Sequence, residues 1–192
     1  MKIIEFLGIP RAGKTTQIKL LSKFLQNRGK KVLVLTDRER ARNLFTPPTE
    51  GLAYTLLFFS QVIESYFKNK DKVDYLLIDR GIFDVVVWSD VRLHFKEITR
   101  KECESLKVIF KRFRNLIDAT IYFKSFHETS IQRHTYTKHE VVDDVAMNKK
   151  WLYALSVAYK KNRKLFINCL SLDGSKSIDV LRKQIEKFIL KV

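Results

Sequence analysis

The residues best suited to chemistry lie near the start of the chain, in Gly8-Ile9-Pro10-Arg11-Ala12-Gly13-Lys14-Thr15. They match G-x-x-x-x-G-K-[ST], a pattern in which glycines let backbone N–H groups surround phosphate oxygens. The lysine of this pattern reaches the β- and γ-phosphates, and the hydroxyl group binds Mg²⁺. An apolar run precedes the loop at residues 3–7, and a helix-patterned segment leaves it at Lys14. This setting favours a nucleoside-triphosphate site over a structural glycine turn.

A second group of candidate residues follows another apolar run, at 75–78. Asp79 ends that run, where a strand can deliver a carboxylate to the Mg²⁺ shell or to the acceptor oxygen. Arg80 comes next, and Arg11 lies within the loop itself. Phosphoryl transfer spreads negative charge over the moving group, so two fixed guanidinium groups could neutralise it, with Arg11 acting as an arginine finger in cis. A polar strand end and solvated arginines are the alternatives.

The spacing of apolar residues predicts alternating strands and helices. Strands are expected at 1–7, 31–36, 73–79, 119–124 and 164–170, and helices at 14–28, 52–69, 128–133 and 178–190. A loop and helix are expected over 80–95, a helix opened by a Thr99/Glu102 capping box, and a further helix carrying Met147, Trp151, Leu155 and Ala158. This order predicts one α/β domain over residues 1–192, a P-loop NTPase fold in three layers (α/β/α) with a five-stranded parallel sheet. The ligand is expected at the carboxyl edge of the strands.

Composition limits the class of protein. With 192 residues, 45% of them hydrophobic and 30% charged, the chain is typical of a single globular domain. Its two cysteines and four histidines show no metal-ligand spacing, and its apolar runs are too short for a membrane span or a signal peptide, so a cytoplasmic protein is expected. The net charge of +16 indicates a lysine-rich surface, attraction of phosphorylated substrates, or nucleic-acid binding.

Several motifs resemble those of thymidylate kinases, in order along nearly the whole chain. The segment from Pro10 to Gln17 resembles the R-A-G-K-[ST]-T-Q loop of the type whose catalytic arginine lies in the loop. Four further matches follow it. They are Arg38-Glu39 (the R-E element), Leu56-Leu57-Phe58 (the start of the substrate helix), Asp79-Arg80 (D-R-[YFH]) and residues 128–133 (E-T-A-x-x-R, which opens the lid).

The resemblance implies a kinase that uses ATP and Mg²⁺ and phosphorylates a (deoxy)nucleoside monophosphate such as dTMP. It assigns the donor nucleotide to Gly8, Ile9, Pro10, Arg11, Ala12, Gly13, Lys14, Thr15, Thr16 and Arg133, the last lying against adenine. It assigns the metal to Thr15 and Asp79, catalysis to Arg11, Lys14, Asp79 and Arg80, and the acceptor to Arg38, Glu39, Arg80 and a stacking Phe58 or Phe59. It also implies a homodimer and a small lid at 133–144 that excludes water.

The acceptor half of the chain departs from the family pattern. Pro10 replaces an acidic residue, Leu7 the glutamate before the first glycine, Val62 a base-reading arginine, and Gly81 the aromatic residue of D-R-[YFH]. Gln61 is a candidate base reader, because an amide offers one donor and one acceptor, and a solvated helix glutamine is the alternative. Two other functions stay open: a kinase for a deoxynucleoside, a polynucleotide 5′-hydroxyl or a small metabolite, and a nucleotide-binding regulatory protein without turnover.

Overall fold

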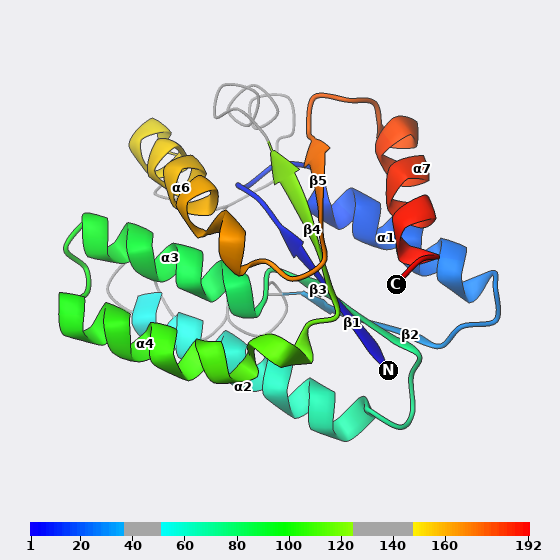
Figure 1. Cartoon of the computed structure of the whole chain (residues 1–192), viewed down its shortest axis with the longest axis horizontal. Coiled ribbons are helices and arrows are strands. Elements are labelled where there is room, and N and C mark those ends of the chain that lie inside the picture. The colour runs from blue at the N-terminus through cyan, green and yellow to red at the C-terminus, as the bar shows by residue number, and fades with distance from the viewer. Residues whose placement is uncertain (37–50, 125–147) are drawn as a thin grey trace.

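Five parallel strands form the centre of the structure, a computed structural model that describes residues 1–36, 51–124 and 148–192. The sheet has the order β2-β3-β1-β4-β5, as Figure 1 shows. Its strands are β1 (Lys2–Leu7), β2 (Val32–Thr36), β3 (Tyr75–Asp79), β4 (Ala119–Lys124) and β5 (Cys169–Asp173). The described helices are α1 (Lys14–Gln26), α2 (Gly51–Asn69), α3 (Ile82–His94), α4 (Arg100–Phe113), α6 (Lys149–Asn162) and α7 (Ile178–Ile189).

The central position of β1 determines where the candidate site forms. This strand pairs with β3 on one side, with Phe6 opposite Asp79, and with β4 on the other, with Leu7 opposite Tyr122. Because all strands run in the same direction, the residues that follow β1 meet the end of β3 at one edge of the sheet. The loop at residues 8–15, called the phosphate loop below after its sequence motif, and Asp79 are therefore neighbours, as the sequence predicted.

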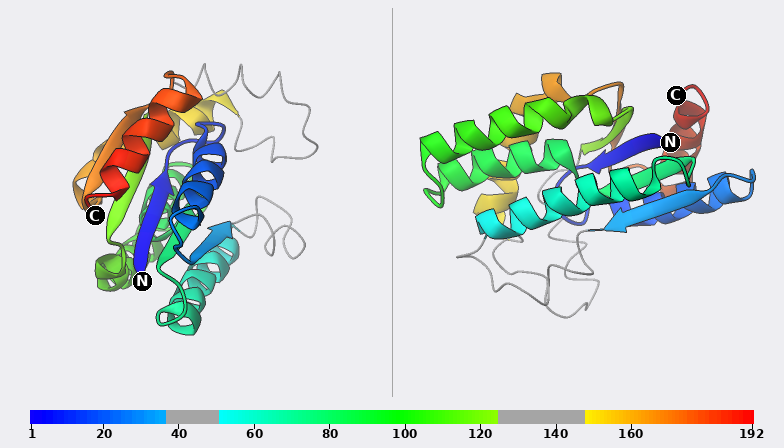
Figure 2. Two further views of the ribbon diagram at one scale, coloured as in Figure 1. Left: turned by 90° about the vertical axis from the view of Figure 1, so that its right-hand side faces the viewer. Right: turned by 90° about the horizontal axis from the view of Figure 1, so that it is seen from below.

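Helices cover both faces of the sheet. Figures 1 and 2 show α1 and α7 on one face, and α2, α3, α4 and α6 on the other. Helix α1 buries Ile18, Leu21 and Leu25, the face expected from their spacing. Gln17, which matches the thymidylate kinase loop motif, uses its side chain structurally: Nε2 donates to the carbonyl oxygen of Ile178 at 2.9 Å and joins α1 to the start of α7.

The strands and helices match the predicted order, with one error. The expected strand at 164–170 is wrong for most of its length, because residues Arg163–Leu165 form a 3-10 helix and β5 begins at Cys169. The apolar residues there fill the core instead: Phe166 is buried and packs against Tyr122 and Phe83. The expected helix at 128–133, the lid at 133–144 and Met147 lie outside the described residues.

Glu5 is a fully buried carboxyl group within β1, and it shapes the turn after β3. Its Oε1 accepts hydrogen bonds from the backbone N–H groups of Phe83 and Asp84, both at 3.0 Å, at the start of α3. A Cβ atom on Gly81 would lie 2.8 Å from Cδ of Glu5. The glycine that departs from the D-R-[YFH] pattern is therefore required by the carboxyl group beneath it. Burial outweighs these N–H donors and raises the pKa of Glu5 from 4.5 to about 8.

We expect Glu5 to make the protein less stable as the pH rises. Between about pH 4.5 and 8 the folded state holds a proton on Glu5 that the unfolded state has released, so the free energy of unfolding falls with increasing pH. In this range the slope corresponds to the release of about one proton per molecule on unfolding. Glu5→Gln should remove most of this slope. Chemical denaturation at a series of pH values measures it. Glu104→Gln, at an exposed position on α4, is the matched control. If Glu5→Gln kept the same pH dependence as the unmodified protein, Glu5 would not be the group responsible.

Candidate functional site

The phosphate loop turns sharply at glycines. Gly8 has φ of 139°, and a Cβ atom there would lie 2.8 Å from the carbonyl oxygen of Phe123 on β4. Gly13 has φ of 95° and occupies the N-cap position of α1, where no side chain caps the helix. The first N–H groups of α1 thus face the loop without a capping oxygen, which is the arrangement that binds a phosphate group. Arg11 has φ of 61° within the same loop, a conformation that costs a non-glycine residue about 1 kcal/mol or more.

Lys14 is buried and held against the loop. Its Nζ donates to the carbonyl oxygens of Gly8, at 3.0 Å, and Ile9, at 3.1 Å. The ammonium group therefore sits inside the curve of the loop, next to the N-terminus of α1. A phosphate group bound in this loop would offer its oxygens to the same ammonium group.

Thr15 and Asp79 form the pair of groups expected to hold a metal ion. The Thr15 hydroxyl donates to Oδ2 of Asp79 at 2.7 Å, across 64 positions of sequence. Asp79 is only 5% exposed, and within the described parts of the chain its Oδ1 is buried and accepts no hydrogen bond. A buried acceptor of this kind, beside a hydroxyl oxygen and a phosphate loop, fits the oxygen ligands that Mg²⁺ prefers.

Arg80 turns away from the strand and pairs with a carboxylate that the sequence interpretation missed. The residue has φ of 67°, and its Nη1 lies 3.2 Å from Oδ2 of Asp84 on α3. The pair is largely buried, and the guanidinium carbon lies 5.4 Å from the ring centroid of Trp88. Asp84 follows Arg80 by four residues, so this spacing was the available signal.

Tyr159 joins this network from α6, far along the sequence. Its hydroxyl oxygen lies 3.1 Å from the carbonyl oxygen of Gly8 and also contacts Oδ1 of Asp84. Tyr159 is fully buried, and desolvation raises the pKa of its phenol well above the ordinary value. The hydroxyl group therefore stays protonated. No motif marks this residue, so sequence patterns could not have identified it.

The predicted acceptor residues are only partly described. Phe58 is buried in the core, and Phe59 packs edge-to-face against Phe110 and Phe113 of α4, at centroid distances of 4.7 and 5.0 Å. Phe59 thus stabilises the contact between α2 and α4, and the stacking of either ring on a base stays a prediction. Gln61 is 8% exposed and forms no hydrogen bond within the described ranges. Arg38, Glu39 and Arg133 lie outside the described residues.

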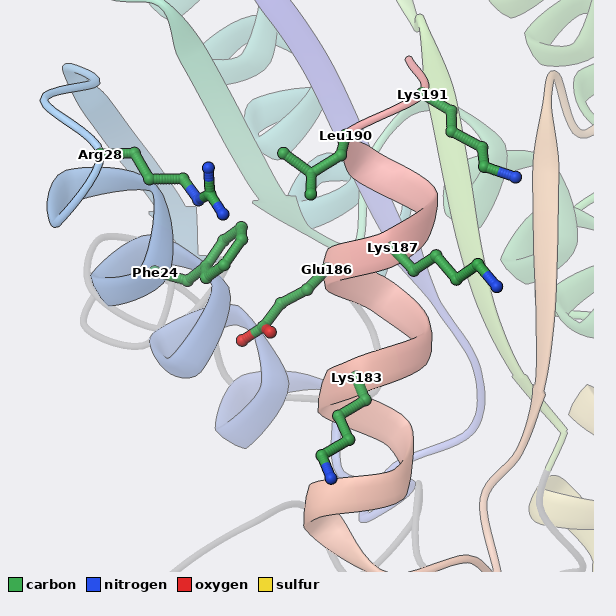
Figure 3. A pocket seen from close by; sticks show the side chains of 7 residues that line it. All are labelled: Phe24, Arg28, Lys183, Glu186, Lys187, Leu190 and Lys191. Atoms are coloured by element: carbon green, nitrogen blue, oxygen red, sulfur yellow. The ribbon is translucent and has the colours of Figure 1, made fainter.

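A separate open hollow of about 440 Å³ lies between α1 and α7. It is lined by Phe24, Arg28, Lys183, Glu186, Lys187, Leu190 and Lys191. Figure 3 shows the side chains of Lys187 and Lys191 pointing away from Phe24 and Arg28. Because these cations do not converge, they resemble a solvated basic surface more than a second anion site.

Comparison with solved structures agrees with the P-loop geometry. The structure of deoxyadenosine kinase from M. mycoides with bound dATP superimposes with a TM-score of 0.76 and 13% identity, covering 98% of this chain and 99% of that one. The same kinase with dCMP and dCDP gives 0.63 and 15%, covering 99% of this chain and 100% of that one. The chain has the P-loop nucleoside kinase fold. The predicted fold class, a five-stranded parallel sheet between helices, is confirmed.

The similarity in sequence is more limited in length. A thymidylate kinase of Caldanaerobacter subterraneus subsp. tengcongensis is 35% identical in an alignment of 94 residues, and the match covers 42% of this chain and 45% of that protein. The match thus spans less than half the length of that relative. No model of a known protein family matches this chain.

Loss of the Asp79 carboxylate should remove most of the effect of Mg²⁺ on ATP binding. Asp79→Asn replaces a charged oxygen by an amide, so we expect the gain in ATP affinity on adding Mg²⁺ to fall by about tenfold or more. Calorimetric titration with ATP, in Mg²⁺ and in EDTA, measures this gain. Asp71→Asn, an exposed change between α2 and β3, is the control. An unchanged response to Mg²⁺ in Asp79→Asn would exclude this carboxylate from the metal site.

Proposed function

We propose that this protein is a nucleotide kinase that transfers the γ-phosphoryl group of MgATP to a (deoxy)nucleoside monophosphate such as dTMP. The observation that carries the proposal is the 2.7 Å contact between Thr15 and Asp79, made next to the buried Lys14 of a phosphate loop. The partial similarity to a thymidylate kinase and the nucleoside kinase fold support the same reaction class.

The described residues divide the work of phosphoryl transfer between them. Lys14 and the N–H groups at the start of α1 would hold the donor phosphates, and Thr15 and Asp79 would hold Mg²⁺. The bound metal ion would offset charge on the β- and γ-phosphates. Arg11, within the loop, would neutralise the moving phosphoryl group, and Arg80 would approach the acceptor from the end of β3. Catalysis of this kind depends on positioning and charge, and the rigid sheet edge provides both.

A monophosphate acceptor agrees with the residue type that precedes the phosphate loop. In this reaction an oxygen of the acceptor's own phosphate group attacks the γ-phosphoryl group of ATP. That oxygen is already ionised and needs no general base, whereas a 5′-hydroxyl group must lose a proton. The position before Gly8 is Leu7, fully buried and apolar, so no carboxylate stands there. Gln61 could read the base, since the residue is 8% exposed and its amide forms no hydrogen bond within the described residues.

A deoxynucleoside is the second candidate acceptor. The deoxyadenosine kinase fold covers nearly the whole chain, and Asp84 offsets the charge of Arg80, which suits an uncharged acceptor. In that reaction Asp79 would be placed to take the proton of the attacking hydroxyl group.

Partners and location remain predictions. Leu56 and Phe67 on α2 are 41% and 63% exposed, so this helix is the candidate surface for a homodimer. A nucleic-acid partner rests on net charge alone. We place the kinase in the cytoplasm. In the described ranges, no helix has the length and apolar character to cross a bilayer.

An acceptor panel tests the proposal directly. We expect ADP release from MgATP to depend on an added deoxynucleoside monophosphate, with dTMP first in the panel. Lys14→Ala and Arg11→Ala should reduce kcat by about 10³-fold or more, because each removes a charge that the transition state needs. A coupled assay of ADP measures both.

The other outcomes of the panel separate the alternatives. Turnover only with deoxynucleosides supports the second candidate, and turnover only with a 5′-hydroxyl oligonucleotide supports a polynucleotide kinase. ATP binding without turnover on any acceptor supports a regulatory protein. Full activity in Lys14→Ala would reject the site. Lys19→Ala, exposed on α1, is the matched control.

Gln61 should determine which base is accepted. Gln61→Leu keeps the volume of the side chain and removes both hydrogen-bonding groups, so KM for the preferred acceptor should rise by about tenfold or more while kcat changes little. Ser60→Ala, at the exposed neighbouring position, is the control. An unchanged ranking of the four bases in Gln61→Leu would remove this residue from base recognition.

A further inference from the structure

The carbonyl oxygen of Gly8 has two hydrogen-bond donors from opposite ends of the chain. Nζ of Lys14 lies at 3.0 Å and the hydroxyl oxygen of Tyr159 at 3.1 Å. All three residues are buried, so this oxygen cannot turn to bulk water for a replacement partner. A buried carbonyl group that loses its donors weakens the state in which it is left.

Tyr159 is held so that its hydroxyl group cannot leave this position easily. It is 0% exposed on α6, and its ring stacks on Tyr122 of β4, with centroids 5.5 Å apart. The hydroxyl group has one proton and lies against two acceptors, Gly8 and Asp84, so it can donate fully to only one of them at a time. When the hydroxyl group donates to Gly8, Asp84 keeps the ion pair of its other oxygen with Arg80.

Binding of the donor nucleotide must change this arrangement. Lys14 cannot keep both loop carbonyls and also bind the β- and γ-phosphates with full strength. When its ammonium group moves to the phosphates, the Gly8 oxygen loses one of its two donors. The hydroxyl group of Tyr159 is already within hydrogen-bond distance of that oxygen.

We propose that Tyr159 is a positioning residue that satisfies the Gly8 carbonyl group when Lys14 turns to the donor phosphates. The inference rests on the proposed donor site. It gives α6 a direct effect on nucleotide affinity, although Tyr159 itself touches no phosphate. Without the Tyr159 hydroxyl group, movement of the Lys14 ammonium group to the phosphates leaves the buried Gly8 oxygen without a donor. Lys14 therefore stays bound to the loop more of the time.

The test compares MgATP binding in two phenylalanine variants by calorimetric titration. Tyr159→Phe should weaken binding by about tenfold, the effect of one unpaired buried acceptor. Tyr122→Phe is the matched control, since it removes a hydroxyl group from the stacked neighbouring ring, and within the described residues Tyr122 forms no side-chain hydrogen bond with Gly8 or Lys14. Unchanged affinity in Tyr159→Phe, or equal weakening in both variants, would overturn the inference.

A second measurement needs no nucleotide. Lys14→Ala alone should keep its Tm within about 5 °C, because Tyr159 still serves the Gly8 oxygen. The double variant Lys14→Ala with Tyr159→Phe removes both donors, so its loss of Tm should exceed the sum of the single losses by about 3 °C or more.

The two experiments separate the inference from the proposed function. If the Tm losses of the two single variants simply add in the double variant, or if Lys14→Ala alone loses much of its Tm, Lys14 and Tyr159 do not share the Gly8 oxygen and the inference is overturned. If the unmodified protein fails to bind MgATP, the proposed donor site is wrong, and the ligand-free comparison still decides the role of Tyr159. If Tyr159→Phe does not fold, Lys14→Ala alone remains decisive.

Discussion

The contact between Gly8 and β4 is the constraint on which the rest of the site depends. Because a Cβ atom at Gly8 would lie 2.8 Å from the Phe123 carbonyl oxygen, only glycine lets the chain leave β1 in this direction. The loop then curves over the ends of β1 and β3, which brings Lys14 and Thr15 to Asp79. The proposed phosphate site thus depends on the absence of a side chain at Gly8, directly after the central strand β1.

Buried polar groups lie around this loop, and three of them are paired within the fold. Glu5 holds the start of α3, Asp84 holds Arg80, and Tyr159 reaches Gly8. Such groups are costly in a core unless their partners are in place, and removal of one partner leaves another uncompensated. The donor and acceptor sides of the site are thereby connected through α3, a helix that supplies no ligand for the donor phosphates.

The sequence was most informative where chemistry depends on local spacing. The loop at residues 8–15 and the carboxylate at Asp79 follow directly from short motifs that end apolar strands, and the structure brings them together. Tyr159 could not be found in this way, since 151 positions separate it from Gly8 and only the packing of α6 brings them into contact. The fifth strand was misplaced because the apolar Phe166 packs in the core outside any strand, whereas the true edge strand β5 includes the half-buried Ser171 and the exposed Asp173.

The backbone conformation of the two candidate catalytic arginines also affects how such a site is retained during evolution. Arg11 and Arg80 both adopt left-handed conformations, with φ of 61° and 67°, which glycine would adopt without strain. At these positions, selection for stability alone would favour a smaller residue, whereas selection for phosphoryl transfer favours a guanidinium group. Arg80 also compensates the buried Asp84, so a lineage that lost its acceptor would be free to change Arg11 first, and glycine at position 11 would mark a relative that has given up catalysis.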